Sequence, residues 1–535
     1  MKFLIIDGFV DEPTCLGVPP YISTYVRYVA GAAYLTGIRD IFYKTITQVR
    51  ESDFFVSDWD YIVIIAGNPV PGKYLGGMPI QLNEIEEIAK KNKKAQIFLG
   101  GPIQFEEISF NNQNIHLVEK DIESFIYHYF RFSDSSFRYR TVEELNKFAI
   151  SGAFIVKDHP RFPDVIVEIE TGRGCPRKTH CSFCIEGLFD VEFRKPEDIV
   201  KEIETLSYYG IKHFRIGKQA DLYSYGADLS NFKNGFPAPN PIWIERLYKG
   251  IRDRISNIET LHLDNVNPGT IANFPEQSRK ITEIIVEHNT AGDVAAFGME
   301  SADPVVIEKN NLKATPEEIY FAIEMLNQIG GKRENGIPKL LPGINIIKGL
   351  IGENKDTFRK NYEFLLKVKQ NGLLLRRINI RQIKPSKKTK IHTTKDEKIL
   401  DAIFRNYREK IRNEIDNYML NQIFPVGTLL TNLIVESHRG DWSLARQIGT
   451  YPITVNIPKK IELLKKVDSF VISHRERSIV GLSYPFSFNK ATLNEIKEIP
   501  GIGKKATNYF LNKEFFKEEI EKLEIFEKIK SHLID

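Results

Sequence analysis

A strand–helix pattern that repeats between residues 165 and 390 constrains the fold of this 535-residue chain more than any other feature. Short apolar runs such as DVIVEIE, FRIG, TLHL and DVAAFGME alternate with amphipathic segments that end near glycine. This alternation is typical of parallel strands joined by covering helices. It predicts a partial parallel βα barrel of about six units over residues 165–390.

The segments on either side of this barrel have patterns of their own. The runs KFLIIDG, YIVIIAG and QIFLGG, separated by helical segments, predict a doubly wound, flavodoxin- or Rossmann-like α/β domain. Beyond the barrel, short alternating strands punctuated by glycine predict a small antiparallel β-barrel. The expected organisation is a doubly wound domain (1–130), a linker (131–164), the βα barrel (165–390), a helix with a small β domain (391–482) and a helical end (483–535).

Three of the four cysteines lie within one short stretch, TGRGCPRKTHCSFC, as Cys175, Cys181 and Cys184. The stretch follows the first barrel strand, where βα barrels carry their catalytic loops. A disulfide would leave one of the three unpaired, and a zinc site would need a fourth ligand such as His180. An iron–sulfur cluster with three protein ligands would leave one iron open to a small molecule.

The surround of these cysteines, RGCP…CSFC, resembles that of the radical SAM superfamily. The spacing here is C-x₅-C-x₂-C, two residues longer than the usual C-x₃-C-x₂-C. The resemblance implies that Cys175, Cys181 and Cys184 bind a 4Fe–4S cluster. It also implies that S-adenosylmethionine (SAM) binds the remaining iron and is cleaved to a 5′-deoxyadenosyl radical.

Later strand ends carry further positions of the same resemblance. GMES matches the fourth strand of the family and implies that Glu300 and Ser301 contact the ribose or methionine of SAM. NIIKGLIGE matches the fifth strand, which lies along the adenine, and is centred on Gly349. At the second strand the family has Gly-Gly-Glu, whereas this chain reads Gly217-Lys218-Gln219, so Gln219 would replace the glutamate.

The N-terminal domain resembles the cobalamin-binding domain that precedes the barrel in many radical SAM enzymes, through its first strand, PPYISTYVRYVAGAAYL and IFLGGP. Its ligand edge would be formed by the loops Asp7–Pro20, Gly67–Met78 and Gly100–Gln104. The Asp-x-His-x-x-Gly motif that offers a histidine to cobalt is absent. The sequence leaves two readings open, a domain that binds cobalamin and a degenerate domain that no longer does.

The C-terminal third is basic: from Arg381 onward there are 28 Lys and Arg against 20 Asp and Glu. The small β domain faintly resembles the TRAM-type barrel of tRNA-modifying enzymes. LNEIKEIPGIGKKATNYFL resembles a helix-hairpin-helix, in which Gly501 and Gly503 would turn backbone N–H groups toward a phosphate beside Lys504 and Lys505. A hairpin that only docks on protein is the alternative.

These features predict a radical SAM enzyme that modifies RNA such as tRNA, by methylation if cobalamin is present. The alternatives are C-methylation of a protein or small molecule, and a non-catalytic nucleic-acid-binding protein with a structural metal centre. A ferredoxin or flavodoxin is the expected electron donor. There is no apolar run of 18 residues, and MKFLIIDGFVDEP becomes acidic too early for a signal peptide, so no membrane span and a cytoplasmic location are expected.

Overall fold

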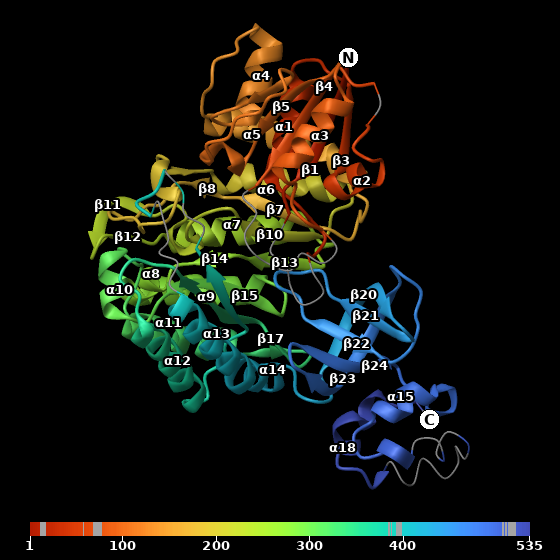
Figure 1. Cartoon of the computed structure of the whole chain (residues 1–535). Helices are drawn as coiled ribbons and strands as arrows, with labels where there is room; N and C mark the ends of the chain where they lie inside the picture. The colour runs from red at the N-terminus through yellow and green to blue at the C-terminus, as the bar shows by residue number, and fades with distance from the viewer. Residues whose placement is uncertain are drawn as a thin grey trace.

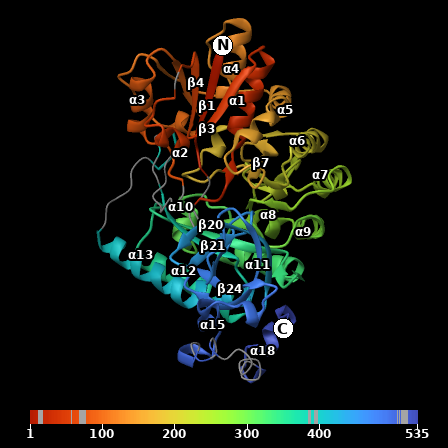
Figure 2. The same ribbon diagram turned by 90° about the vertical axis from the view of Figure 1, so that its right-hand side faces the viewer.

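The computed structural model of the chain is a mixed α/β fold built on parallel-strand sheets (Figure 1). The N-terminal domain lies at the top of the view, the βα barrel in the middle, and a second, smaller barrel beside and below it. A quarter turn brings this smaller barrel in front of the βα barrel (Figure 2). The structure describes residues 1–10, 18–56, 58–67, 77–383, 386, 388–391, 398–505, 508, 511 and 521–534.

The N-terminal domain contains a five-stranded sheet in the order β3-β1-β4-β5-β6, in which every neighbouring pair is parallel. This is the strand order of flavodoxin-like folds. The strands are β1 (Lys2–Gly8), β3 (Asp40–Thr45), β4 (Tyr61–Ala66), β5 (Gln96–Gly100) and β6 (Ile115–Leu117).

Helices cover both faces of this sheet because successive side chains of a strand point to opposite faces. Phe3 and Ile5 pack in the core that also holds residues of α1 (Thr24–Leu35), α4 (Ile122–Phe132) and α5 (Val142–Ser151). Their neighbours Leu4 and Ile6 pack in a second core with residues of α2 (Ile46–Glu51) and α3 (Leu82–Lys91). Helix α5 belongs to the segment expected to be a linker, yet it packs on α1.

Six parallel strands form the partial barrel, as two sheets in the orders β13-β10-β7-β2 and β14-β15-β18-β19. β13 and β14 are separated by Asp264 alone and act as one interrupted strand. The barrel strands are β7 (Ile166–Glu170), β10 (His213–Gly217), β13 (Thr260–Leu263) with β14 (Asn265–Val266), β15 (Asp293–Glu300), β18 (Leu340–Lys348) and β19 (Arg377–Gln382).

Helices follow these strands as the sequence pattern predicts. They include α6 (Pro196–Tyr208), α7 (Pro241–Arg254), α8 (Pro268–Asn273), α9 (Pro275–His288), α10 (Pro304–Lys309), α11 (Pro316–Gly330) and α12 (Lys355–Gln370).

The N-terminal domain adds a short strand to the barrel, which the sequence did not predict. β2 (Tyr21–Ile22) precedes α1 and pairs in parallel with β7. Tyr21 donates a hydrogen bond to the carboxylate of Glu168 on β7. The edge of the barrel next to β7 is therefore covered by backbone from the preceding domain, which fixes the two bodies against each other.

The C-terminal β domain is a closed five-stranded barrel in the order β20-β21-β22-β24-β23. Four of its pairings are antiparallel, whereas β22 and β24 pair in parallel. The sequence predicted a purely antiparallel barrel, and the parallel pair corrects this prediction. The order and the parallel pair match a Greek-key barrel of the OB type. Its strands are β20 (Leu429–Arg439), β21 (Trp442–Arg446), β22 (Thr454–Ile457), β23 (Lys466–Arg475) and β24 (Ser478–Tyr484).

The predicted helix-hairpin-helix is described only in its first half. α15 (Leu493–Glu498) leads into a turn in which Gly501 and Gly503 have φ of +95° and +50°. Ile496, Ile499 and Ile502 pack this half against the C-terminal barrel. Most of the second helix and the side chain of Lys504 lie outside the described residues, so the phosphate-binding role of Gly501, Gly503, Lys504 and Lys505 stays a prediction.

Candidate functional site

The cysteine loop begins directly after β7 and is closed by a short hairpin. β8 (Gly172–Arg173) pairs with β9 (Glu192–Phe193) and brings the two ends of the loop together. Gly174 follows with φ +83°, and a Cβ at this position would lie 2.6 Å from the carbonyl oxygen of Asp190. Glycine is therefore required here by both conformation and space.

All three cysteines of the loop line one cavity of about 190 Å³ at the carboxyl ends of the barrel strands. The residues expected in the metal site therefore converge, although eight residues lie between the first cysteine and the last. The remaining lining residues are Pro176, Arg177, His180, Glu186, Lys218, Gln219, Ala220, Asp221, Ser224, Asn265, Asn267 and Lys313.

Burial makes the thiolate forms of these cysteines unfavourable on their own. It raises the pKa of Cys175, and it raises the pKa of Cys184 to about 12. A thiolate is the form that binds metal, so the cavity must supply positive charge to hold three of them.

Lys313 and Arg177 supply positive charge from the protein. Burial lowers the pKa of Lys313, but the neighbouring Cys181, Glu300 and Cys184 raise it, and the net direction is upward. Arg177 Nη1 lies 3.4 Å from Cys181 Sγ, and the same guanidinium donates to the carbonyl of Leu312 at 3.2 Å. Lys313 has no recognisable signal in the sequence, since only the chain fold brings it from the start of the α11 unit to the cysteines.

Gln219 is the cavity residue most clearly prepared for a ligand. It is 8% exposed, and neither its amide oxygen nor its amide nitrogen has a hydrogen-bond partner. A buried amide without partners is costly, so these two atoms mark a place for an absent polar group. Gly217, at the end of β10, has a different role: it lets the side chain of Glu168 lie close to the backbone of β10. A Cβ at this position would lie 2.9 Å from Glu168 Oε1.

Asp221 holds the loop that carries Gln219. Its buried carboxylate accepts from Ser224 Oγ at 2.6 Å, Thr270 Oγ1 at 2.7 Å and the backbone N–H of Asn267 at 2.9 Å. Asn265 Nδ2 in turn lies 3.3 Å from the carbonyl oxygen of Gln219. The ends of β10 and β14 are therefore fixed to each other beside the cavity.

Glu300 lies at a distorted strand end next to Lys313. The register of β15 against β18 shifts at this point, and Glu300 has φ +62°, a conformation that non-glycine residues rarely adopt. Burial raises the pKa of its carboxyl to about 7, which Lys313 partly counteracts. Its Oε2 has no hydrogen-bond partner, but Glu300 does not line the cysteine cavity, so its contact with SAM stays a prediction.

Ser301 and Gly349 use their polar groups within the protein. Ser301 Oγ accepts from the backbone N–H of Asp303 at 3.1 Å. Gly349 has φ +102°, and its N–H donates to Glu353 Oε2 at 2.8 Å. Neither lines the cysteine cavity, so contacts of these two residues with SAM stay predictions.

The zinc alternative through His180 finds no support in the geometry. His180 Nε2 lies 3.1 Å from the carbonyl oxygen of Cys175 and is engaged with the backbone of the loop. Within the described ranges, no three His, Cys, Asp or Glu side chains converge closely enough for a single metal ion. The three cysteines instead line a cavity of about 190 Å³, which is larger than a single metal ion.

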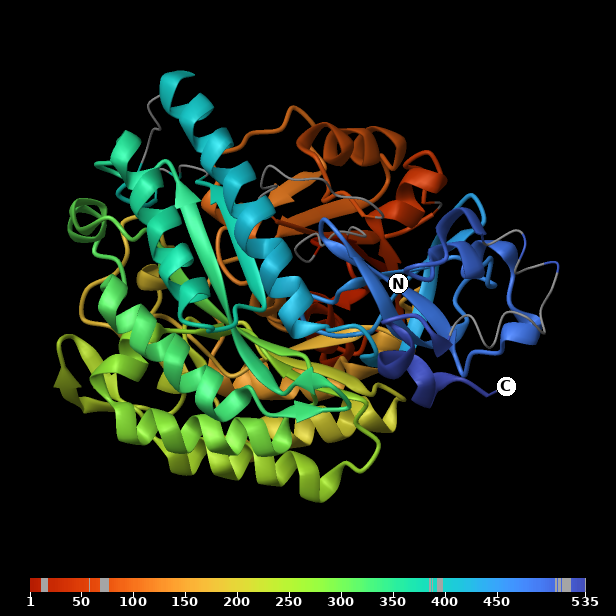
Figure 3. The same ribbon diagram turned by 90° about the horizontal axis from the view of Figure 1, so that it is seen from below.

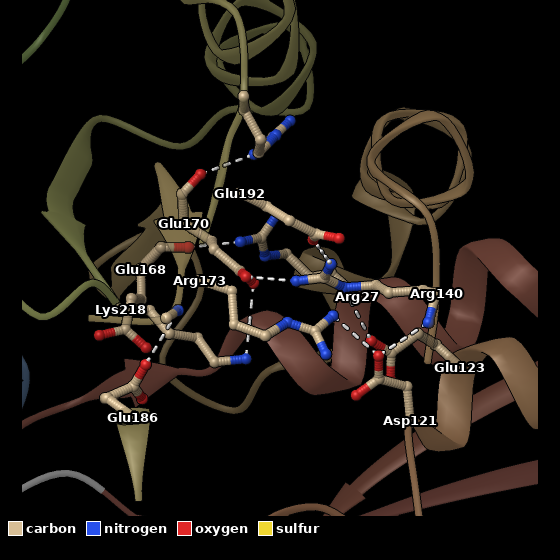
Figure 4. A network of polar contacts seen from close by, with 12 residues as sticks. Arg27, Asp121, Glu123, Arg140, Glu168, Glu170, Arg173, Glu186, Glu192 and Lys218 are labelled. Carbon is tan, nitrogen blue, oxygen red and sulfur yellow. Dashed lines mark hydrogen bonds and ion pairs between the residues drawn. The ribbon is translucent and has the colours of Figure 1, made fainter. Parts of the chain in front are cut away.

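A buried network of charges connects this cavity to the N-terminal domain (Figure 4). Lys218, which lines the cavity, lies 3.5 Å from Glu170 Oε2, and Glu170 also pairs with Arg140. Arg173, immediately before the cysteine loop, pairs at 2.8 Å with Asp121, which precedes α4. Asp121 follows the carboxyl end of β6, so the ligand edge of the N-terminal sheet faces the cysteine loop.

The cavity fits the group that the radical SAM resemblance implies. Three thiols can ligate three irons of a 4Fe–4S cluster and leave the fourth to another molecule. The unpartnered amide of Gln219, which lines the cavity, is suited to bind a polar group of SAM. Together, Cys175, Cys181 and Cys184 would hold the cluster, and Gln219 and Lys313 would lie beside its ligand.

Comparisons with other proteins find full-length relatives and partial ones. An uncharacterized protein of Archaeoglobus fulgidus is 42% identical over 509 residues, which cover 94% of this chain and 93% of the relative. The ribosomal protein uS12 methylthiotransferase RimO of Clostridioides difficile is 24% identical over 278 residues, 50% of this chain and 56% of that protein.

Among solved structures, the fold is similar to those of two radical SAM enzymes. The radical SAM methyltransferase TsrM from Kitasatospora setae aligns with a TM-score of 0.50 and 12% identity over 73% of this chain and 75% of its own. The cobalamin-dependent SAM radical enzyme OxsB aligns with a TM-score of 0.51 and 14% identity over 76% of this chain and 56% of its own.

The sequence itself matches a family model over the barrel. The model is that of the radical SAM superfamily, and it covers residues 169–365, from the end of β7 into α12. These residues include the cysteine loop and every residue that lines the cysteine cavity. The cavity with three thiols, the partial βα barrel and the family match agree, and the chain contains a radical SAM domain over residues 169–365.

Proposed function

We propose that this chain is a radical SAM methyltransferase that acts on RNA, such as tRNA. The observation that carries the enzymatic part is the convergence of three thiols, a buried lysine and an unpartnered amide on one cavity. The 4Fe–4S cluster and SAM of this superfamily supply a carbon-centred radical that can remove hydrogen from an unactivated carbon. The chain contributes the thiolates, binds SAM and excludes water from the cavity.

Cobalamin is the methyl carrier in this proposal, held between the N-terminal sheet and the cysteine loop. The loops after β1 and β4, which would form most of its site, lie largely outside the described residues. After β5, Gln104 is 7% exposed and its Oε1 has no partner, an orphaned polar atom at the ligand edge of the sheet. The similarity of the fold to that of the cobalamin-dependent enzyme OxsB supports cobalamin as the carrier.

RNA as the substrate rests on the C-terminal modules. The last third of the chain is basic, and its β-barrel has the strand order of folds that bind oligonucleotides. Contacts of lysine and arginine with phosphates would supply the affinity for RNA. The cysteine cavity of the βα barrel would select the nucleotide that is modified.

A protein side chain is the second candidate substrate, because RimO, a partial relative, is named for its action on ribosomal protein uS12. Methylthio transfer itself is disfavoured. Such enzymes use a second cluster with three further cysteines, and Cys15 is the one cysteine of this sequence outside the loop. Its position lies outside the described residues.

A ferredoxin or flavodoxin as the electron donor and a cytoplasmic location remain part of the proposal. Among the described residues, no helix is both long and apolar enough to cross a membrane.

Anaerobic reconstitution tests the central claim. The wild-type chain should bind about four irons and should produce 5′-deoxyadenosine from SAM under reduction. Cys181→Ala should lose both, whereas the matched variant Cys15→Ala should keep both. Full iron and 5′-deoxyadenosine in Cys181→Ala would contradict the assignment of the cluster.

The substrate and the methyl carrier need separate measurements. Mass spectrometry of modified nucleosides and of peptides, with and without the gene, should show one methylated nucleoside that disappears on deletion. A methylated peptide that disappears instead would favour the second candidate. Hydroxocobalamin added to the chain should co-purify with its visible spectrum, and its complete removal by gel filtration would contradict the cobalamin part.

A further inference from the structure

A second cleft, of about 110 Å³, lies where the C-terminal barrel meets the free edge of the βα barrel. β19 is the last strand of its sheet, so the βα barrel is open on this side. Helix α14 (Asn417–Ile423) passes the opening, and the C-terminal barrel stands next to it (Figure 3). The lining residues are Leu375, Arg376, Arg377, Ile378, Asn379, Asp416, Met419, Leu420, Ile423, Phe424, Tyr451, Pro452, Ile453, Glu476 and Arg477.

Arginines stand in a row on one face of β19. Arg377, Asn379 and Arg381 alternate along the strand and share its face. With its amide oxygen turned toward them, Asn379 accepts from Arg377 Nη2 at 3.1 Å and from Arg381 Nη2 at 2.9 Å. Asn379 therefore orients both guanidinium groups, and of the two arginines Arg377 lines the cleft, where its planar guanidinium suits an anion with several oxygens.

Tyr451 projects from the β21–β22 loop of the C-terminal barrel toward the same arginines. The guanidinium carbon of Arg377 lies 3.6 Å from the centre of its ring, and its hydroxyl donates to Asp264 Oδ1 at 3.2 Å. The backbone of the loop is fixed as well, because the N–H of Thr450 donates to His262 Nδ1 at 3.0 Å. Tyr451 itself has φ +52°, a strained conformation that this anchoring maintains.

The β23–β24 turn brings a further cation to the cleft. Its two residues, Glu476 and Arg477, are exposed and line the opening. The cleft then contains three arginines against Asp416 and Glu476. Burial raises the pKa of Asp416 to about 6, while Arg477, Arg412 and Arg377 lower it. The balance of charge in the cleft is positive.

The opposite wall is apolar. Met419, Leu420 and Ile423 of α14 and Pro452 and Ile453 of the loop all line the cleft. A planar, weakly polar group fits between these side chains, whereas the arginines fit a phosphate. In OB-type barrels the turn between the last two strands is one of the loops that contact oligonucleotides, and here that turn carries Arg477.

We propose that this cleft binds one phosphate-bearing nucleotide of the RNA substrate, with its phosphate on Arg377 and Arg477 and its base between Tyr451 and the apolar wall. The inference rests on the proposed RNA substrate. A protein substrate would need hydrogen-bond partners for its backbone, whereas arginine, tyrosine and apolar side chains around one cleft match the chemistry of a nucleotide.

The test measures RNA binding by the full-length chain as a function of salt, with bulk tRNA as the probe. Arg377→Gln and Arg477→Gln should each weaken binding several-fold and should reduce the slope of log Kd against log salt by about one. Arg246→Gln is the matched control, since Arg246 lies on α7, outside the cleft, and pairs with Glu197. Thermal unfolding of each variant checks that it folds, and exposed Arg477 is the safer position.

A nucleoside 5′-monophosphate serves as a second probe that separates the two claims. If tRNA binds but both cleft variants keep the wild-type affinity and slope, the cleft inference is overturned and the RNA substrate stands. If tRNA does not bind but the mononucleotide does, and Arg477→Gln abolishes this, the cleft is supported and the RNA substrate is refuted. If neither probe binds, both claims fail.

Discussion

At the residue scale, Lys313 places a buried positive charge beside the three cysteines that are expected to bind the cluster. Its ammonium group is enclosed with three thiols and the Glu300 carboxyl, and each of these raises its pKa against the effect of burial. An uncompensated cation at this depth would be unstable, so Lys313 and the thiolates stabilise one another.

Lys313→Met should therefore reduce cluster retention. Without the cation, three thiolates and Glu300 share a buried site, and we expect the iron bound per chain after anaerobic reconstitution to fall at least several-fold. Lys313→Arg keeps the charge and should restore most of the iron, which a purely steric role would not predict. Unchanged iron in Lys313→Met would show that the cluster alone balances the thiolates.

Asp7, at the end of β1, predicts a pH effect on stability. Burial raises the pKa of its carboxyl to about 7, against hydrogen bonds from Tyr43 and the N–H of Phe9 that lower it. The folded chain keeps this proton up to about pH 7, whereas the unfolded chain loses it near pH 4. Between these values the folded state binds more protons, so the free energy of unfolding contributed by Asp7 falls as the pH rises.

Asp7→Asn removes this dependence because an amide does not ionise. Relative to the wild type, the variant should gain stability from pH 5 to pH 8, by an amount on the order of a few kcal/mol. Urea unfolding at the two pH values measures the difference. If the free energies of unfolding of the two proteins differ by the same amount at both pH values, Asp7 ionises in the folded chain as it does in water.

At the element scale, the cysteine loop is a turn whose shape is fixed at Gly174. The hairpin of β8 and β9 brings Asp190 against this glycine, and the positive φ and the short approach exclude a side chain. The two residues added to the usual cysteine spacing lie within this closed loop, and the three cysteines still reach one cavity.

Gly174→Ala should disturb the loop and lower both stability and cluster uptake. A Cβ 2.6 Å from a carbonyl oxygen forces backbone movement next to Cys175, in addition to about 1 kcal/mol for the left-handed conformation. Gly37→Ala is the control, since Gly37 has φ +99° and nothing within 4 Å of a new Cβ. Equal iron contents in the two variants would refute a special role of Gly174.

The alternation of strands and helices predicted most of the elements that position the site. Strand ends with Cys175, Gln219 and Glu300 lie at the same end of the barrel because parallel strands must place them there. The pattern could not predict β2, because a strand of two residues is too short to show a period. It could not predict the parallel pairing of β22 with β24 either, because that pairing depends on closure of the barrel. Lys313 was missed for a different reason: a lysine before a helix has no chemical signature until the fold brings thiols to it.

At the scale of the whole molecule, buried ion pairs connect the N-terminal domain to the barrel. Arg27 on α1 pairs with Glu202 on α6, 175 residues away, and its guanidinium also contacts the carbonyl of Glu168. Arg140 contacts Glu170 and Glu123, from the barrel and from α4 (Figure 4). No sequence pattern predicts such distant partners. They set the distance between the edge of the N-terminal sheet and the cysteine cavity.

Arg140 is the residue whose loss should separate the two bodies most clearly. Its side chain is 3% exposed, and Arg140→Met would leave Glu123 and Glu170 as buried carboxylates without their shared cation. Removing one partner of a buried pair costs about 3–5 kcal/mol. We expect thermal unfolding of the variant to begin at a lower temperature and to split into two transitions, the first of them from the N-terminal domain.

Arg138→Gln is the matched control, because Arg138 lies two residues away and its pair with Asp134 is more than a third exposed on both sides. That change should cost less than about 0.5 kcal/mol. Cobalamin binding gives a second measurement, since a carrier held between the two bodies requires their spacing. Arg140→Met should weaken hydroxocobalamin binding while the iron content stays near normal. A single unfolding transition with unaltered cobalamin binding would show that β2 and the apolar contacts alone hold the domains in place.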